Sequence, residues 1–404
     1  MKYKSNKFFI DGFSVEKLAK KYSTPLYCYS YKELKKNIDK FKNNFKSVNP
    51  LICFSVKSNS NRTILNEIGK LGLGADVVSI GELMKALKSG IKSNKIVFSG
   101  VGKTNFELNY AISKKILLIN TESRSEILEI EKIAKKKRLK VDIGIRLNPN
   151  TDAKTLSQIS TGKQENKFGV TEKIFLDLVN YVRKSKYLNL KCLSVHIGSQ
   201  ILDYNPYLKM LKIVEKVIYK TNFKFEYVDL GGGMGIDYKK NNKKLKLNQY
   251  SKNIKKFLNK FNCKIIFEPG RSIIGNTAIL LTKIIYIKEN QKKNFIILDA
   301  AMNDLMRPAL YNAEHNIIPA KKNKKKLNKI FEFVGPICES TDKFLSVKKF
   351  QVLNEKDFVI ISDVGAYGMS LSSNYNLRPK PMEILIKNSK SLVISKRQKL
   401  KELI

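Results

Sequence analysis

The sequence has few cysteines, few histidines, few acidic residues and no long apolar run, and each shortage excludes a class of protein. Its 404 residues include five cysteines and two histidines. The cysteines are scattered and form no C-x-x-C pair, so neither a disulfide scaffold nor a metal site is expected. No run is long enough to cross a bilayer, and the N-terminus lacks the pattern of a secretion signal. We therefore expect a cytoplasmic protein with reduced thiols.

The shortage of acidic residues leaves a formal net charge of +42, which raises the question of nucleic-acid binding. Of the 77 basic residues, nine are arginine and 68 are lysine. Proteins that read nucleic acids favour arginine for bidentate contacts. The lysines are also spread along the whole chain instead of gathering on one element. We expect no specific nucleic-acid partner, only salt-sensitive adhesion to polyanions.

Short apolar runs alternate with helical patterns over the first two thirds of the chain, which indicates a (β/α)8 barrel. The eight runs that predict buried parallel strands are 51–56, 73–78, 95–98, 116–119, 141–147, 190–197, 225–230 and 264–267. The segments with helical periodicity between them include 62–71, 80–89, 123–137, 172–184, 207–219 and 250–261. The predicted barrel spans residues 31–278.

The pattern changes after the barrel, where strands follow one another without long helices. These strands are predicted at 278–288, 295–300, 329–334, 358–362, 382–386 and 391–395. A second, mostly antiparallel β domain is therefore expected from residues 279–404 together with residues 1–30, which contain an extended segment at 25–29. The lysine-rich segment 321–328 is expected to be a solvated loop.

Active sites of such barrels lie at the carboxyl ends of the strands, so the residues that follow each strand are the candidates. Ionisable and glycine-rich groups occur there: Lys57 after the first strand, Arg146 at the end of the fifth, His196 at the end of the sixth, Gly231, Gly232 and Gly233 after the seventh, and Glu268 and Arg271 after the eighth. A lysine at the end of an apolar strand should be desolvated or paired, and desolvation suits an amine that forms a Schiff base. Three glycines after a strand let backbone N–H groups approach a phosphate.

Each of these features also has a purely structural interpretation. The glycine run can be an ordinary turn, and His196 can be a core histidine with satisfied hydrogen bonds. Glu268 and Arg271 can form an internal ion pair, although a carboxylate at that position would also suit a protonated pyridine nitrogen.

Together these residues resemble the alanine-racemase-like (fold-type III) pyridoxal-phosphate decarboxylases over most of the chain, from about residue 12 to residue 386. The segments that carry the resemblance are 18–19, 24–27, 56–59, 74–79, 145–149, 167–169, 196–200, 231–233, 268–271, 306–311, 335–340 and 365–367. The resemblance implies a carboxy-lyase in which the barrel binds pyridoxal 5'-phosphate.

The resemblance also implies a role for individual residues around the cofactor. Lys57 would hold the cofactor covalently, with Asp76 nearby, His196 on the face of the ring, and Glu268 keeping the ring nitrogen protonated. The residues that would surround the phosphate are Ser199, Gly231, Gly232, Gly233, Gly270 and Arg271. The protonated ring would supply the electron sink that decarboxylation requires.

Residues of the second domain would complete the reaction and select the substrate. Cys338 would return a proton to the carbanion, since a thiol with an ordinary pKa of about 8.5 has suitable acidity; a buried structural thiol is the alternative. The residues that would contact the substrate or the cofactor edge are Arg271, Arg307, Tyr311, Glu339 and Tyr367. In this family the cysteine loop enters the neighbouring subunit's site, which implies a homodimer.

Glu339 and Arg307 decide the expected substrate. A glutamate suits a distal ammonium and an arginine suits a distal carboxylate, and meso-2,6-diaminopimelate carries both. The expected products are L-lysine and CO2, in the final step of lysine biosynthesis. Alternatives are a related decarboxylase of ornithine, arginine or carboxynorspermidine, an amino-acid racemase, or a pyridoxal-phosphate-binding protein without catalytic activity.

Overall fold

A computed structural model describes the chain in two compact units. It covers all residues except 154, 156–158, 160, 164, 244 and 292. The barrel unit comprises Ile38–Ile236 and Asn242–Ser272, and the sheet unit comprises Met1–Asn37, Asp237–Asn241 and Ile273–Ile404.

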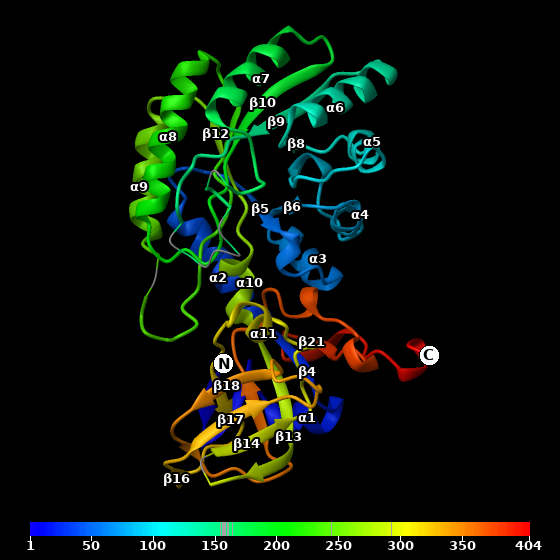
Figure 1. The fold of residues 1–404 in the computed structure, drawn as a ribbon, viewed down its shortest axis with the longest axis vertical. Coiled ribbons are helices and arrows are strands. Elements are labelled where there is room, and N and C mark those ends of the chain that lie inside the picture. Colours follow the sequence, from blue (N-terminus) through cyan, green and yellow to red (C-terminus); the bar gives the residue numbers. More distant parts are fainter. Residues whose placement is uncertain (154, 156–158, 160, 164, 244, 292) are drawn as a thin grey trace. The chain divides into compact units, whose positions relative to one another are not determined.

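The barrel unit contains a closed barrel of eight parallel strands, as the sequence predicts (Figure 1). The strands are β5 (Leu51–Ser55), β6 (Gly74–Val77), β7 (Ile96–Phe98), β8 (Leu118–Thr121), β9 (Val141–Arg146), β10 (Leu188–Ser194), β11 (Tyr227–Asp229) and β12 (Lys264–Phe267). Each barrel strand pairs in parallel with the next strand along the chain. The barrel closes where β12 pairs with β5, with Ile266 opposite Leu51 and Phe267 opposite Ile52. Almost every residue of these strands is buried or half-buried, which explains why their sequences read as continuous apolar runs.

Helices follow the strands and cover the barrel. They are α3 (Arg62–Lys70), α4 (Ile80–Lys88), α5 (Asn105–Ser113), α6 (Arg124–Lys136), α7 (Glu172–Lys184), α8 (Asn205–Thr221) and α9 (Leu247–Leu258), while α2 (Tyr31–Asn44) carries residues of both units. The apolar periodicity did not predict α5, because its Phe106 is 69% exposed and weakens the apolar stripe. A capping box begins this helix: Thr104 accepts from the Glu107 amide, and the Glu107 side chain accepts from the Thr104 amide. The T-x-x-E sequence at residues 104–107 is the signal from which the start of α5 could have been predicted.

The sheet unit is built on a nine-stranded, mostly antiparallel sheet. Its strands are β4 (Leu26–Ser30), β13 (Ala278–Glu289), β14 (Lys293–Leu298), β15 (Ile317–Pro319), β17 (Ile330–Val334), β18 (Lys343–Val347), β20 (Phe358–Ile361), β21 (Met382–Lys387) and β22 (Lys390–Ser395). All five residues of β4 are buried, and this strand pairs with β13 and β21. The expected contribution of the N-terminal segment to this sheet is therefore confirmed. The sequence patterns did not predict β15 or β18.

The lysine-rich segment 321–328 is not entirely a loop. Its last part forms β16 (Lys326–Leu327), which pairs with β19 (Phe350–Gln351). A strand of two residues is too short to show an alternating pattern, so this part of the prediction was wrong.

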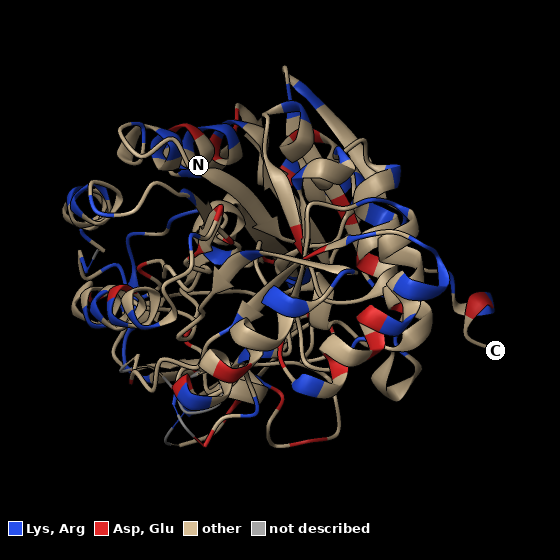
Figure 2. Ribbon diagram, turned by 90° about the horizontal axis from the view of Figure 1, so that it is seen from above, with Lys and Arg blue, Asp and Glu red and all other residues tan. Residues whose placement is uncertain are grey.

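Lysine and arginine positions are distributed over many helices and loops, as the blue parts of the ribbon in Figure 2 show. Within the described part of the chain, no helix combines the length and apolarity needed to cross a membrane. The same residues contain no cluster of histidine, cysteine and carboxylate groups that could hold a metal ion.

Candidate active site

Lys57 lies directly after the first barrel strand, in a short 3-10 turn, η1 (Val56–Ser58). Val56 and Ser58 are buried on either side of it, and the Ser58 hydroxyl donates to the Ser55 carbonyl at 2.7 Å. Lys57 itself is exposed, so of the two expected states, desolvated or paired, burial does not supply the first. Its positive charge does act on the buried carboxyl groups of Asp76 and Glu268, whose pKa values it lowers.

Three buried carboxylic acids line the interior at the carboxyl ends of the strands. They are Asp76 on β6, Asp229 at the end of β11 and Glu268 directly after β12. Burial raises the pKa of Asp76, raises that of Asp229 to about 6, and raises that of Glu268 well above its usual range. The negative charges of Asp229 and Asp76 raise the pKa of Glu268 further, while the Lys57 charge lowers the pKa values of Asp76 and Glu268. Glu268 therefore tends to be protonated until a cation lies beside it.

Small polar side chains of the barrel interior hold these acids in place. Asn120 of β8 donates to Asp229 Oδ2 at 2.9 Å, the Ser99 hydroxyl donates to Glu268 Oε1 at 3.2 Å, and Ser55 donates to Asp76 Oδ2 at 2.8 Å. Glu268 and Asp229 also share a hydrogen bond. The sequence interpretation did not include Asp229 or Asn120 in the site. The signal was available, because both are polar residues inside otherwise apolar strands.

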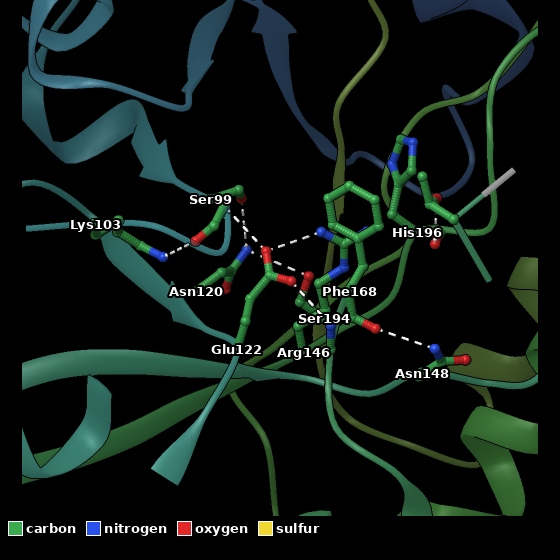
Figure 3. A network of polar contacts seen from close by, with 12 residues as sticks. Ser99, Lys103, Asn120, Glu122, Arg146, Asn148, Phe168, Ser194 and His196 are labelled. Carbon is green, nitrogen blue, oxygen red and sulfur yellow. Dashed lines mark hydrogen bonds and ion pairs between the residues drawn. The ribbon is translucent and has the colours of Figure 1, made fainter. Parts of the chain in front are cut away.

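Arg146, which the sequence placed at the end of a strand, forms a buried ion pair with Glu122. The distance from Nη1 to Glu122 Oε1 is 2.9 Å, and the guanidinium lies over the ring of Phe168, 4.9 Å from its centre (Figure 3). Glu122 Oε2 accepts from the Gly169 amide at 2.9 Å. Asn148 donates to the carbonyl of Phe168 at 3.0 Å. The ion pair between Arg146 and Glu122, together with the Gly169 amide, therefore connects the described ends of the loop after β9 to the barrel.

His196 is neutral and follows β10. Burial lowers its pKa well below the usual value, and the positive charges of Lys57 and Arg146 lower it further. Nδ1 accepts from the Gly232 amide at 3.2 Å, so this nitrogen carries no proton. The 3.8 Å distance from Nδ1 to Glu268 Oε2 is therefore not an ion pair.

The glycines after β11 occupy positions where a side chain would collide with the barrel. Gly231 and Gly233 have φ values of +64° and +86°. A Cβ at Gly231 would lie 2.6 Å from His196 Nδ1, and a Cβ at Gly232 would lie 2.1 Å from the Glu268 carbonyl oxygen. These close approaches explain the run better than an ordinary turn does, since a turn needs no three consecutive glycines.

Arg271 and Ser199 meet beside this glycine run. Arg271 is buried, and its Nη2 donates to the Ser199 hydroxyl at 3.0 Å. Gly270, which precedes it, approaches Ser58 so closely that a Cβ would lie 2.9 Å from the Ser58 side chain.

The donors of this site fit pyridoxal phosphate. The Lys57 amine follows β5, and the close-packed glycine run follows β11. The buried Arg271 and Glu268, a carboxyl group of raised pKa, both follow β12. Phosphate suits the arginine, and a protonated pyridine would offset the cost of ionising Glu268. The amides of Gly231 and Gly232 already donate to Asp229 Oδ1 at 2.9 Å and to His196 Nδ1 at 3.2 Å, so the contribution of these two glycines would be room for the phosphate and not these two donors.

The other predicted residues belong to the sheet unit. Arg307 begins α11 (Arg307–Tyr311) and is 5% exposed, and Tyr311 is half-buried at the end of this helix. Tyr367 is half-buried and has a φ of +58°, which is rare for a bulky side chain and indicates a constrained position. His315, the second histidine, was not predicted to have a role, yet it contacts Arg307.

Cys338 and Glu339 lie on the loop between β17 and β18. Both are exposed, so the alternative of a buried structural thiol is wrong. Asp342 closes this loop: its two carboxylate oxygens accept from the Met302 amide at 2.7 Å and from the Ile337 amide at 2.8 Å.

Glu339 is held by two hydroxyl groups. Tyr375 donates to Oε1, and Thr341 donates to Oε2 at 2.9 Å. These hydrogen bonds lower the pKa of Glu339, so the side chain is an anion on the same loop as the thiol.

Comparison with known proteins gives relatives that cover nearly the whole chain. Residues 31–275 match the family model for the pyridoxal binding domain of pyridoxal-dependent decarboxylases. The diaminopimelate decarboxylase of Helicobacter pylori strain J99 is 43% identical over 97% of each protein. That of Aquifex aeolicus is 40% identical over 98% of this chain and 95% of its own length. Among solved structures, the Helicobacter pylori diaminopimelate decarboxylase complexed with L-lysine has a TM-score of 0.92 and 42% identity, covering 96% of this chain and 98% of that one.

Proposed function

This chain belongs to the pyridoxal-dependent decarboxylases and, within them, to the diaminopimelate decarboxylase family, and from this premise we propose that it converts meso-2,6-diaminopimelate into L-lysine and CO2. The observation that carries the reaction type is the group of Lys57, neutral His196 and protonatable Glu268 at one end of the barrel. Pyridoxal phosphate, when bound, supplies the electron sink that takes up the electron pair left by CO2.

Residues of the barrel unit hold and tune the cofactor in this proposal. Lys57 binds it covalently, Asp76 lies close to it, and His196, as a neutral ring, covers one face. Glu268 keeps a proton on the ring nitrogen, because the buried carboxylate gains a positive partner there. The groups that surround the phosphate are Ser199, Gly231, Gly232, Gly233, Gly270 and Arg271.

Residues of the sheet unit select the substrate and finish the reaction. Arg307 binds the distal carboxylate, and the Glu339 anion binds the distal ammonium. Tyr311 and Tyr367 contact the substrate or the cofactor edge, together with Arg271. Cys338 donates a proton to the α-carbon from which CO2 has left, and its exposed position on a braced loop supports this role.

We also propose that the enzyme is a cytoplasmic homodimer in which the Cys338 loop of one subunit completes the site of the other. Cys338, the proposed proton donor, and the Lys57 amine lie in different units, and the part of the loop that carries Cys338 is exposed in the single chain.

The test is to incubate the purified enzyme, loaded with pyridoxal phosphate, with meso-diaminopimelate, ornithine and arginine separately and to measure CO2 release. We expect release from diaminopimelate alone, because the other two lack a distal carboxylate for Arg307. Preferential release from ornithine or arginine would overturn the substrate assignment. Lys57→Ala is the control, and it should lose both turnover and the visible absorbance of the covalently bound cofactor.

A further inference from the structure

The second histidine of the chain, His315, lies against the arginine proposed to bind substrate. Arg307 is 5% exposed and His315 is 1% exposed. Arg307 Nη1 lies 2.7 Å from His315 Nε2, and His315 Nδ1 lies 2.8 Å from the carbonyl oxygen of Ser362. Both ring nitrogens are therefore engaged.

The chemistry of the two partners fixes the protonation of His315. A guanidinium only donates hydrogen bonds, so Nε2 accepts and carries no proton. A carbonyl only accepts, so Nδ1 carries the proton and donates to Ser362. His315 is thus a neutral imidazole in a single tautomer, with its one lone pair directed at Arg307.

A tyrosine ring restrains the same guanidinium from another direction. The central carbon of the Arg307 guanidinium lies 4.6 Å from the centre of the Tyr238 ring, and the Tyr238 and His315 rings meet edge to face at 5.2 Å. Asn316, next to His315, donates to the Tyr238 carbonyl at 2.7 Å, which ties the two segments together. The acceptor nitrogen of His315 and the ring face of Tyr238 together define the plane of the Arg307 guanidinium, which has five N–H donors.

We propose that His315 is a positioning residue that sets substrate specificity by orienting Arg307 toward the distal carboxylate of the substrate. This inference rests on the proposed function, since it takes from there the role of Arg307. A planar guanidinium binds a carboxylate best when its plane is already fixed, because less conformational entropy is then lost on binding. The expected effect of losing the contact is selective: binding of ligands with the distal carboxylate weakens, and binding of ligands without it does not.

Two substitutions separate the two hydrogen bonds of the ring. The side-chain amide of His315→Asn can reach the Ser362 carbonyl but is too short to accept from Arg307. The longer amide of His315→Gln can accept from Arg307 but cannot reach Ser362 in the same way. The two variants are similar in polarity, so each serves as the control for the other.

The ligands are L-lysine, which retains the distal carboxylate, and cadaverine, which is L-lysine without it. We expect His315→Asn in the cofactor-loaded enzyme to weaken L-lysine binding and to raise KM for diaminopimelate by about tenfold or more. Its kcat and its affinity for cadaverine should stay within about threefold of wild type, because these do not use Arg307. His315→Gln should keep most of the L-lysine affinity.

Nitrogen-15 spectra of the histidines give a readout that does not depend on activity. The chain has only two histidines, so the signals of His315 can be assigned from His315→Gln. A protonated Nδ1 and an unprotonated Nε2 are expected at neutral pH, and the opposite tautomer or an imidazolium would overturn the proposed geometry.

Outcomes that contradict the proposal are distinct from failure of the proposed function. If His315→Asn weakens L-lysine and cadaverine equally, or weakens neither, His315 does not position Arg307 for the carboxylate. If wild-type enzyme does not decarboxylate diaminopimelate at all, the proposed function itself is wrong. Retained cofactor absorbance in both variants shows that the comparison concerns folded protein.

Discussion

At the scale of single residues, the site combines groups whose ionisation depends on one another. Burial and neighbouring carboxylates raise the pKa of Glu268, while burial and neighbouring cations lower the pKa of His196. The barrel end therefore favours a protonated acid and a neutral ring. The protonated pyridine nitrogen of bound pyridoxal phosphate would supply the positive charge that Glu268 needs in order to ionise.

Glu268→Gln should lower kcat by about a hundredfold while the cofactor stays covalently bound, because an amide cannot balance the charge of a protonated pyridine. Steady-state kinetics and the cofactor absorbance measure the two effects separately. Glu67→Gln, which alters a buried glutamate on α3, is the control and should leave kcat nearly unchanged. An unaltered kcat in Glu268→Gln would remove Glu268 from the proposed mechanism.

Cys338→Ala should lower turnover by about a hundredfold without loss of bound cofactor, since it removes only the proton donor. Cys263→Ala, which removes a half-buried thiol of the barrel unit, is the matched control. Wild-type rates in Cys338→Ala would show that another group donates the proton.

At the scale of elements, short connections place the reactive groups, and the long strands and helices support them. Lys57 occupies a three-residue turn, the glycine run is a close-packed connection, and Cys338 lies on a loop that Asp342 closes. The base of that loop has a further link, because the Gly335 amide donates to the Asp342 carbonyl at 3.1 Å.

Asp342→Asn should destabilise this loop, because the amide nitrogen of asparagine cannot accept and either Met302 or Ile337 loses its acceptor. The expected cost is about 1–3 kcal/mol in the free energy of unfolding, measured by urea denaturation, with a lower kcat and unchanged cofactor absorbance.

Asp357→Asn is the control, since Asp357 accepts from the Asn354 amide in an exposed turn of the same unit. Equal effects of the two substitutions would mean that Asp342 has no special part in holding the loop.

At the scale of the whole molecule, the net charge of +42 is the dominant physical feature. Several exposed lysines pair with half-buried glutamates near the surface, such as Lys36 with Glu33 and Lys220 with Glu172. Such surface pairs contribute little to stability, so lysines in excess over acidic residues should repel one another.

The melting temperature should therefore rise when salt is increased from about 0.01 M to about 0.5 M, because the screening length falls well below the spacing of many surface charges. Calorimetry in sodium chloride measures this. A melting temperature that is constant or falls over the range would show that the lysine-rich surface does not reduce stability.

The proposed homodimer predicts complementation between two inactive variants. Mixing Lys57→Ala with Cys338→Ala under conditions of subunit exchange should restore up to about a quarter of wild-type activity, since half of the dimers are hybrid and each hybrid has one complete site. Activity assays on mixtures and on the separate variants measure this. If exchange is shown and no activity returns, the shared-site arrangement is wrong.

The sequence by itself determined the barrel, the second sheet and the candidates at the strand ends. Parallel strands buried on both faces must be apolar throughout, so all eight barrel strands were visible as short apolar runs. Polar residues directly after such strands were equally visible, and they included Lys57, His196 and Glu268.

Only the tertiary structure decided how those residues are arranged. The hydrogen bond between Glu268 and Asp229 and the contact of His315 with Arg307 join residues whose pairing the chain order does not specify. The exposure of Lys57 likewise depends on how the residues around it fold. Protonation likewise follows from burial and from neighbours brought near by folding, which is why the neutral state of both histidines could not be read from the sequence.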